Sequence, residues 1–310
     1  MKSIRISKNE EGITLSKYLR KIFKSMPSNL IQKLVRKKYF DINGKRAKGD
    51  ETLNTDDLIT IHLSDDTFEK YFEENRIQKK VTAIDVDYTD RIIYEDENII
   101  IFNKPVGLLS QGDKSGSQSV NTILNDHIGH HSSSFKPSIV NRLDRNTEGL
   151  IIFAKTYMAA REISSMIKNN KLEKRYKASV NGLVKKDSDE LYNLYKKNEK
   201  DNKAVLKEYS GKVLEGYSLV KLKYKVLKRH KETTDIDVEL ITGKSHQIRA
   251  QFAYIGYPLL SDKKYMNIEL YNDNVKKYGF KTQRLICYKI KFGTFIEERL
   301  KNLSNKTFKI

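Results

Sequence analysis

Residues 141–150, NRLDRNTEGL, place charged groups between two apolar segments, SIV and LIIFAK, that are suited to buried strands. Asp144 lies between Arg142 and Arg145, and neighbouring guanidinium groups favour the ionised form of a carboxylate. An ionised aspartate suits a nucleophile or a base, but an Arg–Asp pair can also simply hold a turn together. From spacing alone the structural pair is the better interpretation, and Gly149 lets the backbone turn into the next strand.

The composition predicts a polyanionic partner. The chain has 310 residues, enough for one large or two ordinary domains, and 59 basic against 40 acidic residues give a net charge of +19. Such an excess favours nucleic acid first and a membrane surface second. A single cysteine, Cys287, excludes an internal disulfide and a cysteine-based zinc site. With no apolar leader and no long apolar run, we expect a cytoplasmic protein without a membrane segment.

Residues 1–63 have the pattern of a small separate domain. Apolar residues recur at helical spacing in two runs: Leu15, Tyr18, Leu19 and Ile22, then Leu30, Ile31, Leu34 and Val35. The segment FDINGK is typical of a strand that enters an Asn43-Gly44 turn, and DDLITIHL of another strand.

The two expected helices carry a segregated basic face. Eight basic residues and no acidic one lie between Ser16 and Lys38. This segregation favours a phosphate-binding face over general solubility. With IQKLVRKKYFDINGKRAKGD, the unit resembles an S4 RNA-binding domain. The residues expected to contact RNA are Lys17, Arg20, Lys21, Lys33, Arg36 and Lys37.

The rest of the chain predicts an α+β fold. Residues 64–87 show no sustained period and are interpreted as a linker. Short β-like runs follow from residue 88 onward, with one clear helix at about 156–169. Because most strands are too close for crossover helices, we expect a mostly antiparallel mixed sheet. The charged segment 185–203 is expected to be an exposed hairpin or loop.

Two further stretches contain candidate functional groups. In LITGKSHQIRAQFAYIGYPLLSD, His246, Gln247 and Arg249 begin a helix-like segment after a strand. Such groups can hold an anion or only cap the helix. In KLEKRYKASVNG, Tyr176 could present its ring to a base, although such a tyrosine is more often part of the core.

Together these stretches resemble the large bacterial pseudouridine synthase family, whose signature is H-R-L-D-x-x-T-S-G-L. The blocks NKPVGLLSQG and LICYKIKF also occur in the family's order, so the resemblance covers residues 88–295. It implies that residues 88–310 form a catalytic domain behind the S4-like domain. Departures from the family pattern are Asn141, Glu148, Lys244 and Gln251.

The resemblance also implies residue roles. Asp144 matches the catalytic aspartate, Arg249 the basic residue that pairs with it, and Tyr176 the tyrosine that packs against the target base. Arg142 matches an arginine that, in some members, enters the RNA helix where the base has left. Leu285 matches an apolar residue near the carboxylate. His246 and Gln247 are expected to support the site.

The implied reaction breaks the N1–C1′ bond of uridine, turns the free uracil and joins C5 to C1′. Because this isomerisation is redox-neutral, no cofactor and no metal are expected. The expected substrate is large-subunit ribosomal RNA, with the protein acting as a monomer. A transfer RNA target and a non-catalytic S4-type RNA-binding protein are the alternatives.

Two other patterns are weaker. Asp85-Val86-Asp87 followed by Thr89 resembles the motif of magnesium-dependent phosphatases, but it lies in the expected linker without a buried strand before it. His127, His130 and His131 could suggest a metal site, but three histidines in a polar loop are more often ordinary loop residues.

Overall fold

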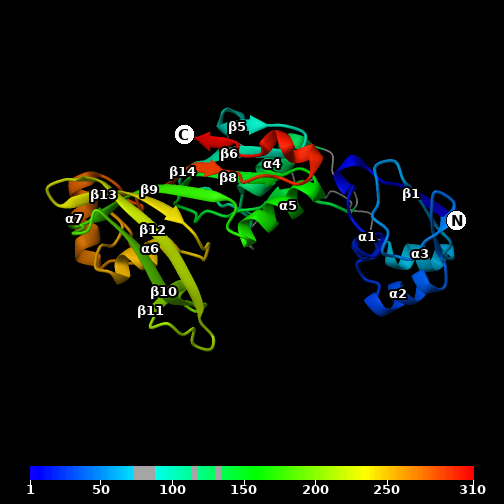
Figure 1. Cartoon of the computed structure of the whole chain (residues 1–310), viewed down its shortest axis with the longest axis horizontal. Coiled ribbons are helices and arrows are strands. Elements are labelled where there is room, and N and C mark those ends of the chain that lie inside the picture. The colour runs from blue at the N-terminus through cyan, green and yellow to red at the C-terminus, as the bar shows by residue number, and fades with distance from the viewer. Residues whose placement is uncertain (73–87, 114–116, 130–133) are drawn as a thin grey trace. The chain divides into compact units, whose positions relative to one another are not determined.

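A computed structural model of the chain describes residues 1–72, 88–113, 117–129 and 134–310 (Figure 1). The chain divides into two compact units. The first comprises residues 1–100, 121–140 and 152–164, and the second residues 101–120, 141–151 and 165–310. Within the described ranges, every helix is too short or too polar to span a membrane. The phosphatase-like residues 85–87, and His130 and His131, lie outside the described residues.

The N-terminal segment folds into a small antiparallel sheet with helices. The strands pair in the order β1-β4-β2-β3. Its elements are β1 (Lys2–Arg5), η1 (Lys8–Glu10), α1 (Leu15–Ile22), α2 (Ser28–Arg36), β2 (Phe40–Ile42), β3 (Lys45–Arg46), β4 (Leu58–Ile61) and α3 (Asp65–Tyr71). The predicted turn between β2 and β3 is present, since Asn43 and Gly44 both have positive φ, at 50° and 78°.

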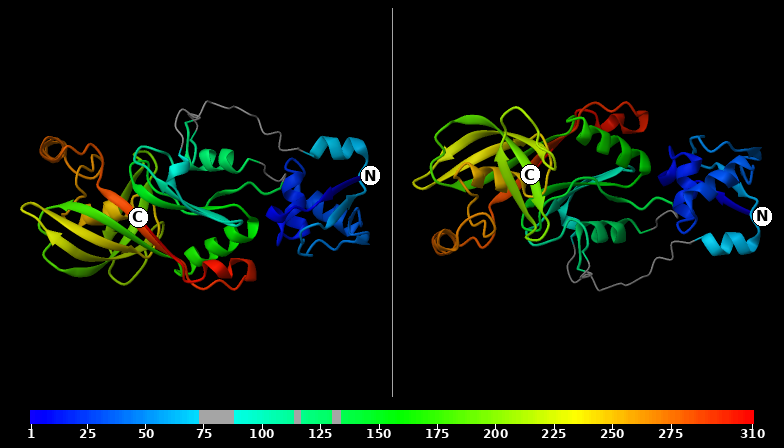
Figure 2. Two further views of the ribbon diagram at one scale, coloured as in Figure 1. Left: turned by 90° about the horizontal axis from the view of Figure 1, so that it is seen from above. Right: turned by 90° about the horizontal axis from the view of Figure 1, so that it is seen from below.

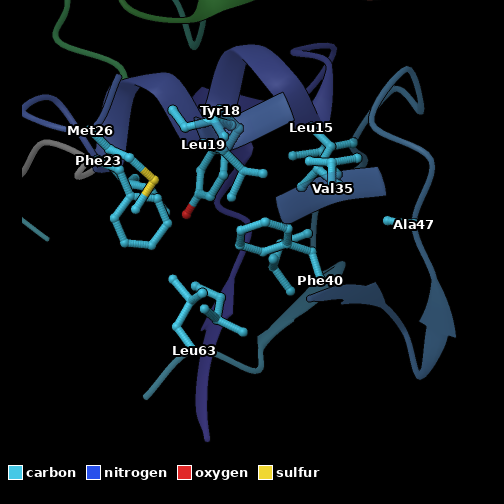
Figure 3. Packing of buried hydrophobic residues seen from close by; sticks show 14 of the residues in the cluster. Leu15, Tyr18, Leu19, Phe23, Met26, Val35, Phe40, Ala47 and Leu63 are labelled. Carbon is cyan, nitrogen blue, oxygen red and sulfur yellow. The ribbon is translucent and has the colours of Figure 1, made fainter. Parts of the chain in front are cut away.

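The core of this segment confirms the two helical stripes. All four apolar residues predicted for the first helix are buried in α1, and Ile31 and Val35 are buried in α2. Figure 3 shows Leu15, Tyr18 and Leu19 pointing from the helix towards Phe40 and Leu63. The opposite faces of both helices are therefore free to carry the basic residues.

The predicted linker begins too early. Residues 65–71 form α3, whose first turn is capped by the hydroxyl of Ser64. Phe68 is buried in the N-terminal core, and its ring stacks on Phe72 with centroids 4.4 Å apart. Phe68 and Phe72 thus extend the N-terminal core to residue 72. The sequence did not predict this extension because the segment has no long apolar period. The remainder of the predicted linker, residues 73–87, lies outside the described residues.

A larger sheet occupies the rest of the chain, and its strands follow the order β11-β10-β12-β13-β9-β14-β8-β6-β5. The strands are β5 (Ile92–Glu95), β6 (Ile99–Lys104), β7 (Ser138–Ile139), β8 (Glu148–Ala154), β9 (Glu173–Asn181), β10 (Ser188–Asn198), β11 (Lys203–Glu208), β12 (Ser218–Arg229), β13 (Thr233–Leu240), β14 (Leu285–Lys291) and β15 (Thr307–Lys309). The helices are η2 (Thr89–Arg91), α4 (Val120–Ile128), α5 (Tyr157–Lys168), α6 (Gln247–Tyr254), α7 (Ile268–Tyr278) and η3 (Glu298–Leu303).

The pairing confirms a mostly antiparallel mixed sheet. Among the strand pairs whose register is described, only β14 with β8 is parallel. The long antiparallel strands β9 to β13, coloured green to yellow, run side by side in Figure 2. The parallel pair brings the turn before β8 next to the start of β14, and this turn contains Asp144.

The segment 185–203 is a hairpin, as predicted, but it is not simply exposed. Its strands β10 and β11 extend the large sheet, and Leu191, Leu194 and Tyr195 are buried. The helix predicted at 156–169 is present as α5. Helices α4 and α7 were not predicted, although apolar residues recur at helical spacing in both, for example Val120, Ile123 and Leu124 in α4.

Candidate active site

Asp144 lies in the turn between β7 and β8. The backbone N–H of Thr147 donates to the carbonyl oxygen of Asp144 at 3.0 Å, which closes the turn. Gly149 follows with a φ of 111°, opposite Cys287 of β14. A Cβ at this position would overlap the backbone of Cys287. Only glycine allows β8 to begin this close to β14, and this close approach fixes the turn that carries Asp144.

Arg249 joins Asp144 to a second carboxylate. Its Nη1 donates to Oδ2 of Asp144 at 3.0 Å. Its Nε and Nη2 donate to the two oxygens of Asp262 at 2.7 and 2.8 Å. The Asp262 side chain is fully buried, whereas that of Asp144 is 23% exposed. The guanidinium group is therefore anchored from the interior and presents one N–H to the accessible carboxylate.

The charge of Arg249 is compensated within the chain. Burial alone would lower the pKa of Arg249, but the hydrogen bonds and negative charges of Asp262 and Asp144 outweigh burial and raise it. The predicted pairing of Asp144 with Arg249 is present. The neighbouring arginines do not form ion pairs with Asp144 in the described part of the chain.

Lys104, at the end of β6, holds the Asp144 turn in place through hydrogen bonds to backbone carbonyl oxygens. It is completely buried. Its ammonium group donates to the carbonyl oxygens of Pro105 at 2.9 Å, Leu108 at 2.9 Å and Arg145 at 2.8 Å. The Arg145 side chain adds a bond from Nε to the carbonyl of Gly107 at 3.0 Å, and the Gly107 N–H donates back to the Arg145 carbonyl at 2.9 Å. Arg145 therefore ties the loop after β6 to the Asp144 turn.

Tyr176 lies within the sheet, in β9. It is 4% exposed and is paired with Val238 on one side and Cys287 on the other. Burial, together with the neighbouring Cys287, raises the pKa of Tyr176 well above its usual value. The structure thus places Tyr176 in the core beside the site, and its contact with a base stays a prediction.

His246 and Gln247 form the entry to α6. His246 has a left-handed backbone with φ of 55°, and its Nε2 lies 3.8 Å from Oδ2 of Asp144. The Gln247 amide bonds within the chain to Thr242, Lys244 and Gln251, and to the carbonyl oxygen of Lys221. Gln247 therefore holds the turn before α6 and does not present its amide to an anion, whereas His246 faces the carboxylate.

Two further predicted residues differ in exposure. Arg142 is exposed and forms no ion pair or hydrogen bond with the described residues, so its guanidinium group is available. Leu285 is buried at the first position of β14, opposite Ala178.

The basic residues of the N-terminal segment do not all behave alike. Lys21 is half-buried, with its ammonium 5.4 Å from the Phe135 ring and 5.2 Å from the Tyr157 ring. Burial lowers the pKa of Lys21. The other five are exposed and form no ion pair with the described residues: Lys17, Arg20, Lys33, Arg36 and Lys37. We call these five the basic face.

Known proteins resemble this chain in sequence and in fold. Residues 98–254 match the family model described as RNA pseudouridylate synthase. The chain is 31% identical to "Ribosomal large subunit pseudouridine synthase C" of Rickettsia bellii, over 83% of each chain. The chain belongs to the RNA pseudouridylate synthase family. As a member of this family it is an isomerase that converts uridine to pseudouridine in RNA.

Other relatives and structures extend the comparison. An "Uncharacterized RNA pseudouridine synthase" of Aquifex aeolicus is 34% identical, over 81% of this chain and 76% of that protein. The solved structure of human RNA Pseudouridylate Synthase Domain Containing 1 aligns with a TM-score of 0.54 at 16% identity, over 66% of this chain and 79% of that one. This structural likeness indicates the pseudouridylate synthase fold.

Sequence reasoning missed three residues of this pseudouridylate synthase site. Asp262 ends the stretch quoted for Arg249 and Tyr265 follows shortly after, but nothing in their spacing singles them out. Lys104 lies in NKPVGLLSQG, where a lone lysine in a mostly apolar stretch could have signalled a buried cation. In the described parts of the chain, no cluster of three or more His, Cys, Asp or Glu residues could hold a metal ion.

Proposed function

We propose that this enzyme converts specific uridines of large-subunit ribosomal RNA to pseudouridine, with Asp144 as the catalytic carboxylate. The observation that carries the proposal is the three-residue arrangement of Asp144, Arg249 and the buried Asp262. In this arrangement, a single N–H of Arg249 holds one oxygen of the accessible Asp144 carboxylate in place. Since Oδ1 of Asp144 accepts no hydrogen bond from the described residues, it is open to a substrate.

An aspartate held in this way suits the isomerisation. The carboxylate can attack C1′ or the base, or remove a sugar proton, and each route requires a fixed and ionised group. Arg249 supplies a positive charge that keeps the position of the carboxylate defined. No redox step occurs, so the proposed reaction needs no cofactor.

The target uridine must leave its stack to reach Asp144, which costs a few kcal/mol. Arg142 is proposed to occupy the vacated position, and its exposure two residues before Asp144 supports this role. Tyr176 is proposed to pack against the flipped base from the sheet. Stacking on an aromatic ring is worth roughly 1 to 3 kcal/mol per base.

The N-terminal segment is proposed to be an S4-type RNA-binding domain. Its support is the basic face on two short helices, above a core that buries their apolar stripes. Phosphate contacts from these residues add affinity that falls with salt. We further propose that the protein is a cytoplasmic monomer, which is consistent with its single, buried cysteine. Light scattering of the purified chain tests the monomeric state.

The ribosomal target is supported by similar proteins. Several relatives at about 30% identity have the printed name "Ribosomal large subunit pseudouridine synthase C". Mapping of pseudouridines in ribosomal and transfer RNA, from cells with and without the gene, tests this proposal. We expect sites to disappear from large-subunit RNA. Loss of sites in transfer RNA alone would support the alternative target instead.

The catalytic role of Asp144 is tested with Asp144→Asn, which retains the shape of the side chain. Pseudouridine formation is expected to fall by roughly a thousandfold or more, while RNA binding is retained. Asp273→Asn, on the exposed face of α7, is the matched control and leaves the rate unchanged. A rate for Asp144→Asn close to that of the wild type would refute the role.

A further inference from the structure

Tyr265 connects the β10–β11 hairpin to the candidate active site. It lies between α6 and α7 and packs against a small core formed by Tyr195, Ala204, Val220 and Ala250. Its ring also faces the Arg249 guanidinium, whose Cζ is 5.2 Å from the ring centroid. A single side chain thus contacts a strand of the hairpin and the arginine that holds Asp144.

The hydroxyl of Tyr265 has two polar neighbours. The backbone N–H of Ala204, in β11, donates to this oxygen at 2.7 Å. Nδ1 of His246 lies 3.2 Å from the same oxygen. A backbone N–H can only donate, so the tyrosine oxygen acts as the acceptor for Ala204. The single hydroxyl proton can then be donated to His246, with Nδ1 as its acceptor.

This direction determines the tautomer of His246. A neutral imidazole has one protonated nitrogen, and Nδ1 can accept only if the proton is on Nε2. Nε2 is the atom that lies 3.8 Å from Oδ2 of Asp144. The chain of donors from Ala204 through Tyr265 therefore directs an N–H group, rather than a lone pair, towards the carboxylate.

The surroundings of His246 favour the neutral ring that this argument requires. Burial lowers the pKa of His246, and so do the positive charges of Arg249 and Lys264, whereas Asp144 and Asp262 act in the opposite direction. The His246 and Tyr265 rings meet edge to face, at 88°, with centroids 5.8 Å apart. Burial also raises the pKa of Tyr265 to about 12, so its hydroxyl keeps its proton at neutral pH.

The hairpin is attached at a second point next to Tyr265. The ammonium group of Lys264 donates to the carbonyl oxygens of Asp201 at 3.3 Å and Asn202 at 2.9 Å, in the turn between β10 and β11. The position of Ala204, and with it the donor to Tyr265, is therefore fixed by the turn that precedes it.

We propose that Tyr265 is a positioning residue, which holds His246 in the tautomer that directs its Nε2–H towards Asp144. The effect on catalysis rests on the proposed role of Asp144. The tautomer itself does not, so the two can be tested separately. Tyr265 touches neither the base nor the sugar in this scheme and acts through His246.

The spectroscopic test uses the full-length protein labelled with ¹⁵N-histidine. Nitrogen chemical shifts report the tautomer of each of the six histidines, and His246→Gln assigns the signal of interest. We expect wild-type His246 to be neutral with the proton on Nε2, and Tyr265→Phe to give a mixture of tautomers. A wild-type ring with the proton on Nδ1, or an unchanged ring in Tyr265→Phe, overturns the proposal.

The kinetic test compares single-turnover rates at saturating RNA. Tyr265→Phe is expected to reduce the rate roughly fivefold to tenfold, the effect of one neutral hydrogen bond, with RNA affinity within about twofold. Tyr271→Phe is the matched control, because among the described residues its hydroxyl bonds only to the Lys281 carbonyl, in an exposed region.

A double variant separates an action through His246 from a general loss of structure. If Tyr265 acts through His246, Tyr265→Phe adds no further loss to His246→Gln. Additive losses contradict the proposal. If the wild-type enzyme forms no pseudouridine in any RNA, the proposed function fails, and the nitrogen shifts alone then decide whether Tyr265 sets the tautomer.

Discussion

Nη1 of Arg249 lies 3.0 Å from Oδ2 of Asp144, although 105 residues separate them along the chain. The same guanidinium group uses its other two edge atoms, Nε and Nη2, for the buried Asp262. Only a planar group with several fixed donors can bind both carboxylates at once. The geometry of the site therefore depends on arginine at position 249 and not merely on a positive charge.

Arg249→Lys tests this dependence. A lysine can pair with one carboxylate but cannot bridge both, so we expect the rate of pseudouridine formation to fall by about a hundredfold or more. The unfolding free energy is expected to fall by roughly 1 to 3 kcal/mol, because hydrogen bonds to the buried Asp262 are lost. Arg161→Lys, on the exposed side of α5, is the control and should change neither quantity. Full activity in Arg249→Lys would contradict the bridging role.

Lys104 predicts a specific dependence of stability on pH. Burial lowers the pKa of Lys104 to about 8, against the opposing charges of Asp144 and Glu148. Between about pH 8 and the ordinary lysine value of 10.5, the unfolded chain holds a proton that the folded chain has released. The titration of Lys104 alone therefore makes the unfolding free energy rise with pH over this pH range, by at most about 1.4 kcal/mol per pH unit.

The measurement compares denaturant unfolding of the wild type and Lys104→Met between pH 7.5 and 10. Both proteins share every other titrating group, so the difference between their unfolding free energies isolates Lys104. We expect this difference to grow in favour of the wild type as the pH rises above about 8. A difference that is independent of pH would show that Lys104 is not shifted.

Gly149→Ala tests the close approach of β8 to β14. The added Cβ would meet the Cys287 backbone, and the φ of 111° is unfavourable for alanine. We expect a loss of more than about 3 kcal/mol in unfolding free energy, since steric overlap adds to backbone strain. Gly216→Ala is the control, because its φ of 73° is also positive but no atom lies within 4 Å of the added Cβ. It should cost only about 1 kcal/mol. Equal losses in the two variants would remove the argument for contact.

The basic face predicts how RNA affinity responds to salt. Changing Lys33, Arg36 and Lys37 to glutamine should weaken RNA binding and reduce the slope of log affinity against log salt by roughly 0.7 to 0.9 per lost phosphate contact. Lys21→Gln should leave the slope unchanged, because its ammonium lies against the Phe135 and Tyr157 rings. Filter binding of the full-length variants over a range of salt concentrations measures both. A reduced slope for Lys21→Gln, or an unchanged slope for the triple variant, would contradict this assignment.

Local patterns predicted the secondary structure well where a single signal dominates. The stripe of Leu15, Tyr18, Leu19 and Ile22 is a helix face, and Asn43-Gly44 is a hairpin turn. The start of the linker was wrong, because Phe68 belongs to the N-terminal core through contacts that a sequence period does not reveal. The hairpin at 185–203 was predicted, but its burial was not, because charged residues dominate the segment and the buried Leu191, Leu194 and Tyr195 do not all fall on one face of the strand.

The site was predictable only in part, and for a physical reason. Asp144, Arg249 and Tyr176 are embedded in recognisable stretches, and the Asp144–Arg249 pair was predicted from the resemblance. Asp262 and Tyr265 act through contacts formed by the folding of the segment after α6, and their spacing carries no period. The departure at Gln251 is also explained in three dimensions, because its amide bonds to Gln247 within α6 and to Asn193 and the Leu191 carbonyl of β10.

The buried Asp262 has a practical consequence. Because it alone binds two edges of the Arg249 guanidinium, removal of the Asp144 charge does not leave an uncompensated cation in the interior. The fold is therefore expected to tolerate the loss of the proposed catalytic carboxylate. With Asp144 in that proposed role, we expect an Asp144→Asn chain to bind its RNA without converting it to product, so that crosslinking in cells would identify the selected uridine.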